Sequence, residues 1–170
     1  MAQLTTFPDG YRALIVGASG GVGRALTQQL AADPRCGSVY AASRSGVAIE
    51  GAQSLSLDFS APQTVEDAVA TASQDGPLHL VIVAAGVLVD EAGRGPEKSW
   101  RQIDPDYMAE VFKINTIGPA LVARHALDVL AKGRKDAPEK AVFAALSARV
   151  GSISDNRLGG WHSYRASKAA

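Results

Sequence analysis

The sequence predicts an α/β fold, in which helices cover both faces of a parallel β-sheet. Short apolar runs, typical of strands buried on both faces, alternate with segments of helical periodicity at a spacing of about 30 residues. Each glycine-rich or polar stretch follows the end of one of these runs. Because parallel strands end at the same edge of a sheet, the stretches are expected to meet there and to bind a ligand.

The predicted elements follow this alternation along the chain. Strands are expected at residues 13–16, 38–42, 54–57, 78–84 and 140–146, and helices at 24–32, 61–73, 105–132 and around Tyr164. The first helix should group Val22, Ala25, Leu26 and Leu30 on one side, and the second should bury Val65, Ala68, Val69 and Ala72. Residues 89–104 and 151–162 are expected to form polar loops, and residues 133–139 a charged connection.

Composition limits the class of protein. The 170 residues carry a formal net charge of zero, with 46% hydrophobic and 20% charged residues, as in soluble globular domains. The absence of a basic block argues against nucleic-acid or membrane-surface partners, and no apolar run approaches the roughly 20 residues of a membrane span. Residues 1–9 lack the layout of a signal peptide. The single cysteine, Cys36, fits a reducing compartment, so a cytoplasmic location is expected, and no metal site is predicted.

A glycine turn lies between the first strand and the first helix. Gly17, Gly21 and Gly23 form a G-x-x-x-G-x-G pattern, in which glycine permits a tight turn and a close approach of the backbone to a pyrophosphate. The strand before the turn and the helix after it are the context that supports a binding turn over a purely structural one. The predicted dinucleotide site also includes the neighbouring residues Ser19, Gly20 and Val22.

The end of the second strand bears on the choice of dinucleotide. A carboxylate there would bind the adenosine ribose and repel a 2′-phosphate, whereas this sequence has Ser43 and Arg44. Arginine binds phosphate and stacks on adenine, so we predict NADP(H) in preference to NAD(H), with a solvated arginine as the alternative. Asp58 either reaches the adenine or caps the helix that follows it. The predicted cofactor site is completed by Phe59, Ala84, Ala85 and Gly86.

Tyr164 and Lys168 are four residues apart and therefore share one face of a helix. A phenol has a reference pKa of about 10, and a nearby ammonium favours the phenolate and lowers that pKa. Such a pair can act as a general acid and base near neutral pH, although an isolated match is usually only a pair on a helix surface.

These motifs, taken with Asn115 and Ser147, resemble those of the short-chain dehydrogenase/reductases, over about residues 11–170. The stretches 115–119 and 146–153 look like those of C-factor and sniffer-type carbonyl reductases. The resemblance implies a Rossmann-like fold. It also implies that Tyr164 donates a proton to a substrate carbonyl as hydride leaves the nicotinamide, while Lys168 holds the nicotinamide ribose. By this resemblance both Tyr164 and Lys168 contact the cofactor. By the same resemblance, Ser147 would polarise the carbonyl and Asn115 would hold a water in a proton relay.

The sequence departs from the family pattern at two places. The asparagine that usually opens the motif at the fourth strand is missing. The usual serine lies three residues before a glycine, and counting back from Gly151 gives Ala148. We therefore predict Ser147 as the functional serine, with Ser152 and Ser154 as alternatives.

Pro119 lies four residues after Asn115 in the expected long helix. Because proline has no N–H, the Asn115 carbonyl loses its helical partner, and the helix should bend there. The freed carbonyl could hold the water, and the alternative is a proline kink without such a role.

The chain ends two residues after Lys168 without a helix stop signal, whereas the family fold implied by the resemblance continues further. We therefore expect residues 1–170 to be one NAD(P)-binding domain that is incomplete at its C-terminal end, without the last strands and the substrate loop. A homo-oligomer through helix 105–132 and the Tyr164 helix is expected, because their apolar faces would otherwise be exposed. The predicted activity interconverts a carbonyl and an alcohol on a small molecule. The alternative is a dinucleotide-binding sensor or signalling protein without turnover.

Overall fold

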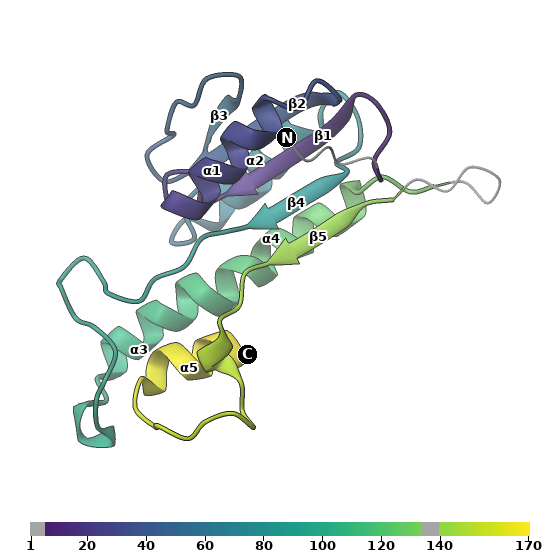
Figure 1. Cartoon of the computed structure of the whole chain (residues 1–170). Coiled ribbons are helices and arrows are strands. Elements are labelled where there is room, and N and C mark those ends of the chain that lie inside the picture. Colours follow the sequence, from purple (N-terminus) through teal and green to yellow (C-terminus); the bar gives the residue numbers. More distant parts are fainter. Residues whose placement is uncertain (1–5, 134–139) are drawn as a thin grey trace.

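Five parallel strands form one sheet in the computed structural model, which describes residues 6–133 and 140–170 (Figure 1). The strands are β1 (Tyr11–Val16), β2 (Cys36–Ser43), β3 (Gln53–Ser56), β4 (Leu80–Val83) and β5 (Val142–Ala145). The helices are α1 (Gly21–Ala31), α2 (Pro62–Ser73), α3 (Pro105–Phe112), α4 (Gly118–Ala126) and α5 (His162–Ala169). The strand order β3-β2-β1-β4-β5 reverses direction beside β1, which is where open α/β sheets bind ligands. The predicted doubly wound parallel fold is confirmed.

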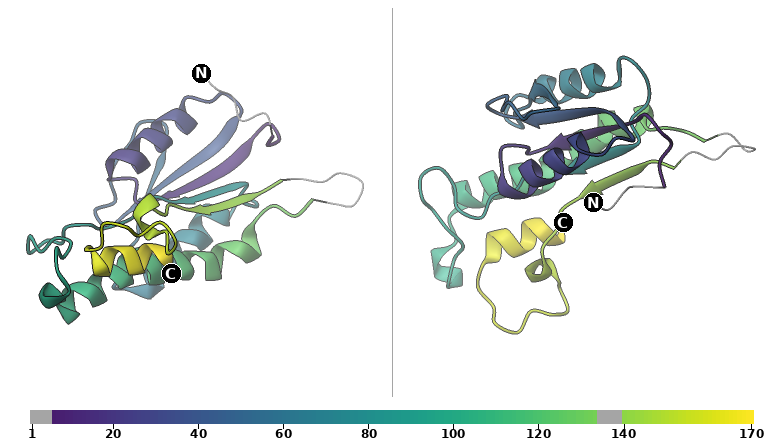
Figure 2. Two further views of the ribbon diagram at one scale, coloured as in Figure 1. Left: turned by 60° about the horizontal axis from the view of Figure 1, so that its bottom comes forward. Right: turned by 45° about the horizontal axis from the view of Figure 1, so that its top comes forward.

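The two larger hydrophobic clusters lie on opposite faces of the sheet, because alternate side chains of β1 point to opposite sides. Leu14 and Val16 belong to the core that includes residues of α2 and α4. Tyr11, Ala13 and Ile15 belong to the other core, which α1 covers. Figures 1 and 2 show α1 on one face of the sheet and both α2 and α4 on the other.

The buried face of α1 differs from the predicted one. Gly23, Thr27 and Leu30 are buried, whereas Val22 is 57% exposed. Gly23 lets the helix pack directly on the glycine turn, and the buried Thr27 hydroxyl donates to the Gly23 carbonyl. Close backbone packing at Gly23 therefore sets the rotation of α1, and apolar spacing does not. In α2 the buried residues are the predicted ones: Val65, Ala68, Val69 and Ala72.

The segment predicted as one helix from 105 to 132 is divided. A π-helical turn, Lys113–Ile117, joins α3 to α4, and a 3₁₀ turn, Leu127–Val129, follows α4. The wide turn ends two residues before Pro119, whose missing N–H deprives the helix of a donor. An irregularity is thus present where the proline predicts one, and a water role for the Asn115 carbonyl stays a prediction. The helix ends before residue 132 because Leu130 is extended and forms a bridge with Leu78.

Strand bounds differ from the predicted ones by a few residues. β2 begins at Cys36 instead of residue 38, and β4 and β5 are shorter than predicted. Residues 134–139 of the expected charged connection lie outside the described residues.

α5 lies beside α3 and away from the sheet (Figure 1). The chain leaves β5, makes a 3₁₀ turn at Arg149–Gly151, crosses a polar loop and returns as α5. A side chain at Gly151 would lie 2.9 Å from the backbone of Lys168. The absence of one lets this turn pack directly on α5, and so the helix is fixed next to the segment that ends β5.

Candidate functional site

A cavity of about 800 Å³ lies where β1, β2 and β4 end, beside the reversal of strand order. Its walls come from the glycine turn, from the ends of β2, β3 and β4, and from the segment after β4. The predicted cofactor residues that line it are Gly17, Ser19, Gly20, Ser43, Arg44, Asp58, Phe59, Ala84, Ala85 and Gly86. Cofactor and small-molecule sites typically have volumes of about 300–1,000 Å³, so the cavity has a suitable size.

The glycine turn forms one wall of the cavity through close backbone packing. Gly17 has a φ of +90°, and a side chain on it would lie 2.5 Å from the Ala85 nitrogen. A side chain at Gly23 would overlap the Gly17 carbonyl oxygen, whereas Gly21 has open space beside it. Gly21, Val22 and Gly23 form the first turn of α1 and are not among the described residues that line the cavity. The turn thus combines packing glycines with one glycine beside open space.

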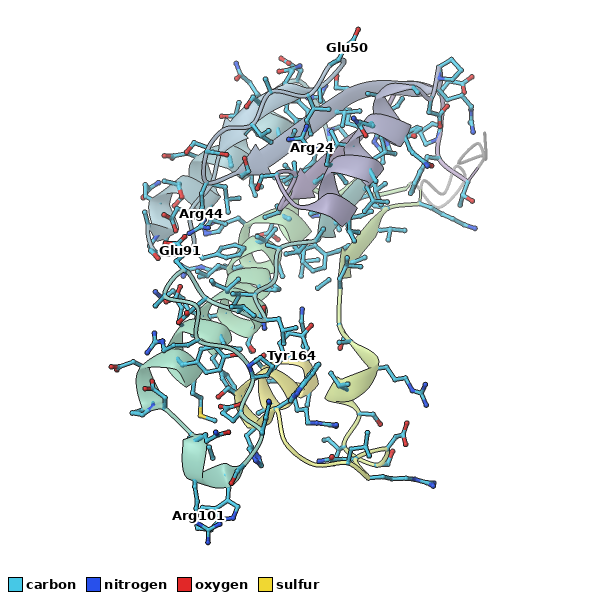
Figure 3. All side chains as sticks on the ribbon, turned by 60° about the vertical axis from the view of Figure 1, so that its left-hand side comes forward. Arg24, Arg44, Glu50, Glu91, Arg101 and Tyr164 are labelled. Atoms are coloured by element: carbon cyan, nitrogen blue, oxygen red, sulfur yellow. The ribbon has the colours of Figure 1, made fainter. Side chains whose placement is uncertain are left out.

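Arg44 connects the end of β2 with the segment after β4 (Figure 3). Its Nη1 lies 2.6 Å from Oε1 of Glu91, and both side chains are largely exposed. Ser43 is buried, and its hydroxyl accepts a hydrogen bond of 3.0 Å from the Val47 amide. Arg44 therefore presents its charge at the cavity, while Ser43 holds the turn after β2.

Asp58 lines the cavity and does not cap α2. Its Oδ1 accepts a hydrogen bond of 2.8 Å from the Ser60 amide, which is an Asx turn. The Asp58 amide donates to Oγ1 of Thr64, and α2 begins at Pro62 without a side-chain cap at residue 61. Of the two roles considered for Asp58, the helix cap is therefore wrong. Phe59, the next residue, packs its ring on Gly118, where any side chain would collide with it.

Asn115 is buried and ties the end of β4 to α5. Its Nδ2 donates to the Val87 carbonyl and to Oγ of Ser167, each at 3.0 Å, and its Oδ1 accepts from the Val87 amide at 2.8 Å. At Gly86, in the cavity wall, a Cβ would lie 3.3 Å from both Asn115 Oδ1 and Lys168 Nζ. The side chains of Asn115 and Lys168 therefore both lie next to Gly86, behind the cavity wall.

Lys168 reaches this wall from the C-terminal part of α5. Its Nζ donates to the Leu146 carbonyl at 2.8 Å. Burial lowers the pKa of the Lys168 ammonium, because desolvation disfavours the charged form. Tyr164 lies one turn earlier on the same helix (Figure 3), with its ring 6.2 Å from Trp161 in an edge-on arrangement. Neither Tyr164 nor Lys168 is among the described residues that line the cavity, so their contact with the cofactor stays a prediction.

Of the three candidate serines, Ser147 is the one that forms a hydrogen bond with α5. Its Oγ donates to the Lys168 carbonyl at 2.8 Å. Ser152 and Ser154 lie in the exposed loop with their Oγ atoms 3.5 Å apart, and Ser152 also accepts from the Asp155 amide. Of the three candidates, Ser147 is therefore the one whose hydroxyl contacts the backbone of Lys168.

Two residues at this site are not predicted from the sequence. Ser167 is buried, accepts from Asn115 and donates to the Tyr164 carbonyl at 2.9 Å. Glu97 is buried and accepts hydrogen bonds from Ser163 at the start of α5. An acid in a polar segment normally indicates a solvated loop, so the sequence carries no signal for the burial of Glu97.

The described residues, 6–133 and 140–170, contain no helix with the length and apolar character needed to cross a membrane. Nor do they bring together three or more His, Cys, Asp or Glu side chains in a way that could hold a metal ion.

Known proteins share both the sequence pattern and the fold. The short chain dehydrogenase family matches residues 11–170. The 1-hydroxy-2-glutathionyl-2-methyl-3-butene dehydrogenase of Rhodococcus sp. (strain AD45) is 31% identical over 167 residues, which cover 92% of this chain and 65% of that protein. This chain therefore spans slightly less than two thirds of the length of that relative.

Solved structures of similar architecture include the NADPH-bound carbonyl reductase from chicken fatty liver, with a TM-score of 0.77 at 26% identity over 98% of this chain and 69% of that one. Sniffer of Caenorhabditis elegans has a TM-score of 0.75 at 22% identity, over 96% of this chain and 75% of its own. A carbonyl reductase of Pseudomonas aeruginosa PAO1 has a TM-score of 0.73 at 24% identity, over 94% and 72%. The last two show likeness of fold alone. Because the family match extends from the start of β1 through α5, this chain belongs to the short-chain dehydrogenase/reductase family.

Proposed function

We infer that this chain is the cofactor-binding and catalytic part of an NADP(H)-dependent oxidoreductase that interconverts a carbonyl and an alcohol on a small molecule. The observation that carries the proposal is the position of Gly86. Its backbone faces the cavity, and Asn115 and Lys168 lie in contact distance behind it. A dinucleotide held by the glycine turn and a reacting group beside α5 would therefore share one wall.

The described residues fit a nicotinamide dinucleotide. The cavity is large enough, and the open space beside Gly21 leaves the N-terminus of α1 accessible to a phosphate. Arg44 supports NADP(H) over NAD(H), because a guanidinium suits a phosphate and no carboxylate stands at the end of β2. The similar carbonyl reductase from chicken fatty liver is described as NADPH-bound, which supports the same choice.

The proposed chemistry joins a hydride and a proton to a carbonyl, or removes both from an alcohol. The nicotinamide would supply or accept the hydride at the carbonyl carbon. The Tyr164 hydroxyl would give its proton to the carbonyl oxygen, and Ser147 would polarise that oxygen. Lys168 would hold the ribose and support the proton transfer, and Asn115 would hold a relay water. Burial lowers the pKa of Lys168, so its ammonium exchanges a proton more readily than a solvated lysine does.

The organisation of the protein is part of the proposal. Residues 1–170 would form a single NAD(P)-binding domain in the cytoplasm, a location that the single cysteine supports.

Copies would associate through α3, α4 and α5, since Ile117 and Leu127 leave apolar surface exposed next to α4. Light scattering during size-exclusion chromatography tests this, and a particle of one chain would contradict it.

Oxidation of NADPH with a panel of aldehydes and quinones tests the activity. We expect the Tyr164→Phe variant to lower kcat by about 10²- to 10⁴-fold, because it removes the proton donor. It should still bind NADPH, measured by quenching of the partly exposed Trp161. If NADPH binds and no carbonyl is reduced, the proposed enzyme gives way to a dinucleotide-binding sensor. If neither NADPH nor NADH binds, both are wrong.

A further inference from the structure

Glu97 is a buried acid in the segment between β4 and α3, and only 4% of it is exposed. A buried carboxylate is costly unless hydrogen bonds compensate it. The Ser163 amide donates to both carboxylate oxygens, at 3.3 and 3.1 Å, and the Ser163 hydroxyl also donates to Oε1. The partners of Glu97 thus belong to a helix that begins more than sixty residues later in the chain.

The start of α5 lacks a cap of its own. The N-cap residue, Trp161, makes no side-chain hydrogen bond to the helix and has a left-handed backbone with a φ of 55°. Helix N-termini normally receive an oxygen on the second or third amide, which satisfies a free N–H and complements the helix dipole. Glu97 provides that oxygen to Ser163, the second residue of α5. It therefore caps the helix from a distant part of the chain.

The backbone of Glu97 also contacts the residues just before α5. The Trp161 amide donates to the Glu97 carbonyl, and a side chain at Gly160 would lie 3.2 Å from the same oxygen. A bulky residue in the left-handed region is unfavourable and persists only where the surroundings impose it. The contact with Glu97 is such a constraint, and it directs the chain into α5 just before Tyr164.

The other end of α5 is held independently. Ser147 Oγ donates to the Lys168 carbonyl, and Thr116 Oγ1 donates to the Ser167 carbonyl, both at 2.8 Å. At the N-terminal turn, where Tyr164 lies, Glu97 caps the helix, and Nη1 of Arg165 in the same turn donates to the Val150 carbonyl at 3.1 Å. The segment that carries Glu97 also lines the cavity, with Asp90, Glu91 and Arg94 among its residues.

We propose that Glu97 is a positioning residue for Tyr164, which it acts on by capping α5 from the segment that borders the cofactor cavity. This inference rests on the proposed function, because Tyr164 must be the proton donor for its position to matter. Glu97 touches neither cofactor nor substrate in this role. Its loss should therefore reduce the rate of proton transfer and leave cofactor affinity unchanged.

The kinetic experiment compares Glu97→Ala and Glu97→Gln with the full-length wild type, using NADPH and the best carbonyl of the panel. We expect Glu97→Ala to lower kcat by about 10- to 100-fold, because small displacements of a reacting group are costly. Glu97→Gln keeps one acceptor oxygen and should recover part of the rate. NADPH affinity should stay within about twofold in both, since Glu97 is not among the described residues that line the cavity and the phosphates are proposed to bind at the glycine turn. The matched control is Glu66→Gln, an exposed acid on α2.

Hydrogen–deuterium exchange gives a readout that does not need activity. Glu97→Ala should speed exchange of the amides from Ser163 to Lys168, while peptides of β1 and β2 keep wild-type rates. Unchanged exchange in α5 would overturn the inference, as would a fall in cofactor affinity with an unchanged kcat. If the wild type reduces no carbonyl, the proposed function fails, and the exchange result still decides whether Glu97 holds the helix. Ser163→Ala, which removes only the hydroxyl, provides a milder variant if Glu97→Ala does not fold.

Discussion

Arg44 and Glu91 form an ion pair between the end of β2 and the segment after β4, with Nη1 and Oε1 2.6 Å apart. Both residues line the cavity. Because the pair is exposed, its contribution to folding stability is small, about 0–1 kcal/mol. Its main effect would concern the ligand, because the guanidinium proposed for a 2′-phosphate already faces an anionic side chain.

Removal of this competing carboxylate should favour NADPH. We expect Glu91→Gln to tighten NADPH binding by about two- to fivefold at low salt and to leave NADH binding unchanged, since only NADPH carries the 2′-phosphate. Arg44→Gln should weaken NADPH binding and spare NADH. Fluorescence titrations of tryptophan with both dinucleotides measure this. Equal effects on the two would contradict a role of Arg44 in phosphate recognition.

The choice among the serines has a direct test. We expect Ser147→Ala to lower kcat by about 10- to 100-fold, because the proposed polarisation of the carbonyl is lost. Ser152→Ala removes the same hydroxyl from an exposed loop and serves as the matched control. Steady-state kinetics of the two variants should differ by at least about tenfold. A greater loss in Ser152→Ala would show that the wrong serine was chosen.

Two glycines of one turn should respond oppositely to a methyl group. At Gly23 the new Cβ would overlap the Gly17 carbonyl, so we expect Gly23→Ala to destabilise the protein by about 1–3 kcal/mol or more. At Gly21 nothing lies within 4 Å, so Gly21→Ala should keep or slightly raise the melting temperature. Thermal unfolding followed by circular dichroism compares them. Reduced NADPH affinity in Gly21→Ala would indicate that this open space belongs to the dinucleotide site.

The buried phenol of Tyr11 should make stability fall at alkaline pH. Burial, followed by the hydrogen bond to Asp33 at 2.9 Å, raises the pKa of Tyr11 above its usual value. Above about pH 10 the unfolded chain releases this proton and the folded chain retains it, so the free energy of unfolding decreases as pH rises. Lys168, whose pKa burial lowers, acts in the opposite sense below about pH 10.4.

Urea unfolding at about pH 9 and about pH 11 separates the two groups. Between these values, the midpoint should fall more steeply in the wild type than in Tyr11→Phe, which lacks the titrating hydroxyl. An identical slope in both proteins would show that Tyr11 is not responsible.

The central strands β1, β2 and β4 were predictable because they are largely buried and therefore form apolar runs, whereas β3 and β5 are more exposed. The clustering of the strand ends followed from the handedness of parallel connections, and it brought Arg44, Asp58 and Gly86 to one cavity. Periodicity failed in α1, where contact at Gly23 outweighed the apolar spacing. The spacing of apolar residues predicts which face of a helix is apolar, but it does not predict which backbone segment packs against the helix.

The long-range polar contacts could not be predicted. Glu97 and Ser163 are separated by more than sixty residues, and neither belongs to a recognisable pattern. The same holds for Asn115, whose predicted part was its carbonyl, while its side chain joins Val87 to Ser167. Such contacts depend on the final distance between α3, α5 and β4, which only the folded structure provides.

Gly86 does not have a positive φ. Glycine is therefore favoured at this position because little space is available for a side chain, and not because of the backbone torsion angles. At this point only the main chain of Gly86 separates the cavity from the Asn115 amide and the Lys168 ammonium. Even one methyl group at residue 86 would press on both groups at once, and the lysine and the asparagine would have to move apart to admit it.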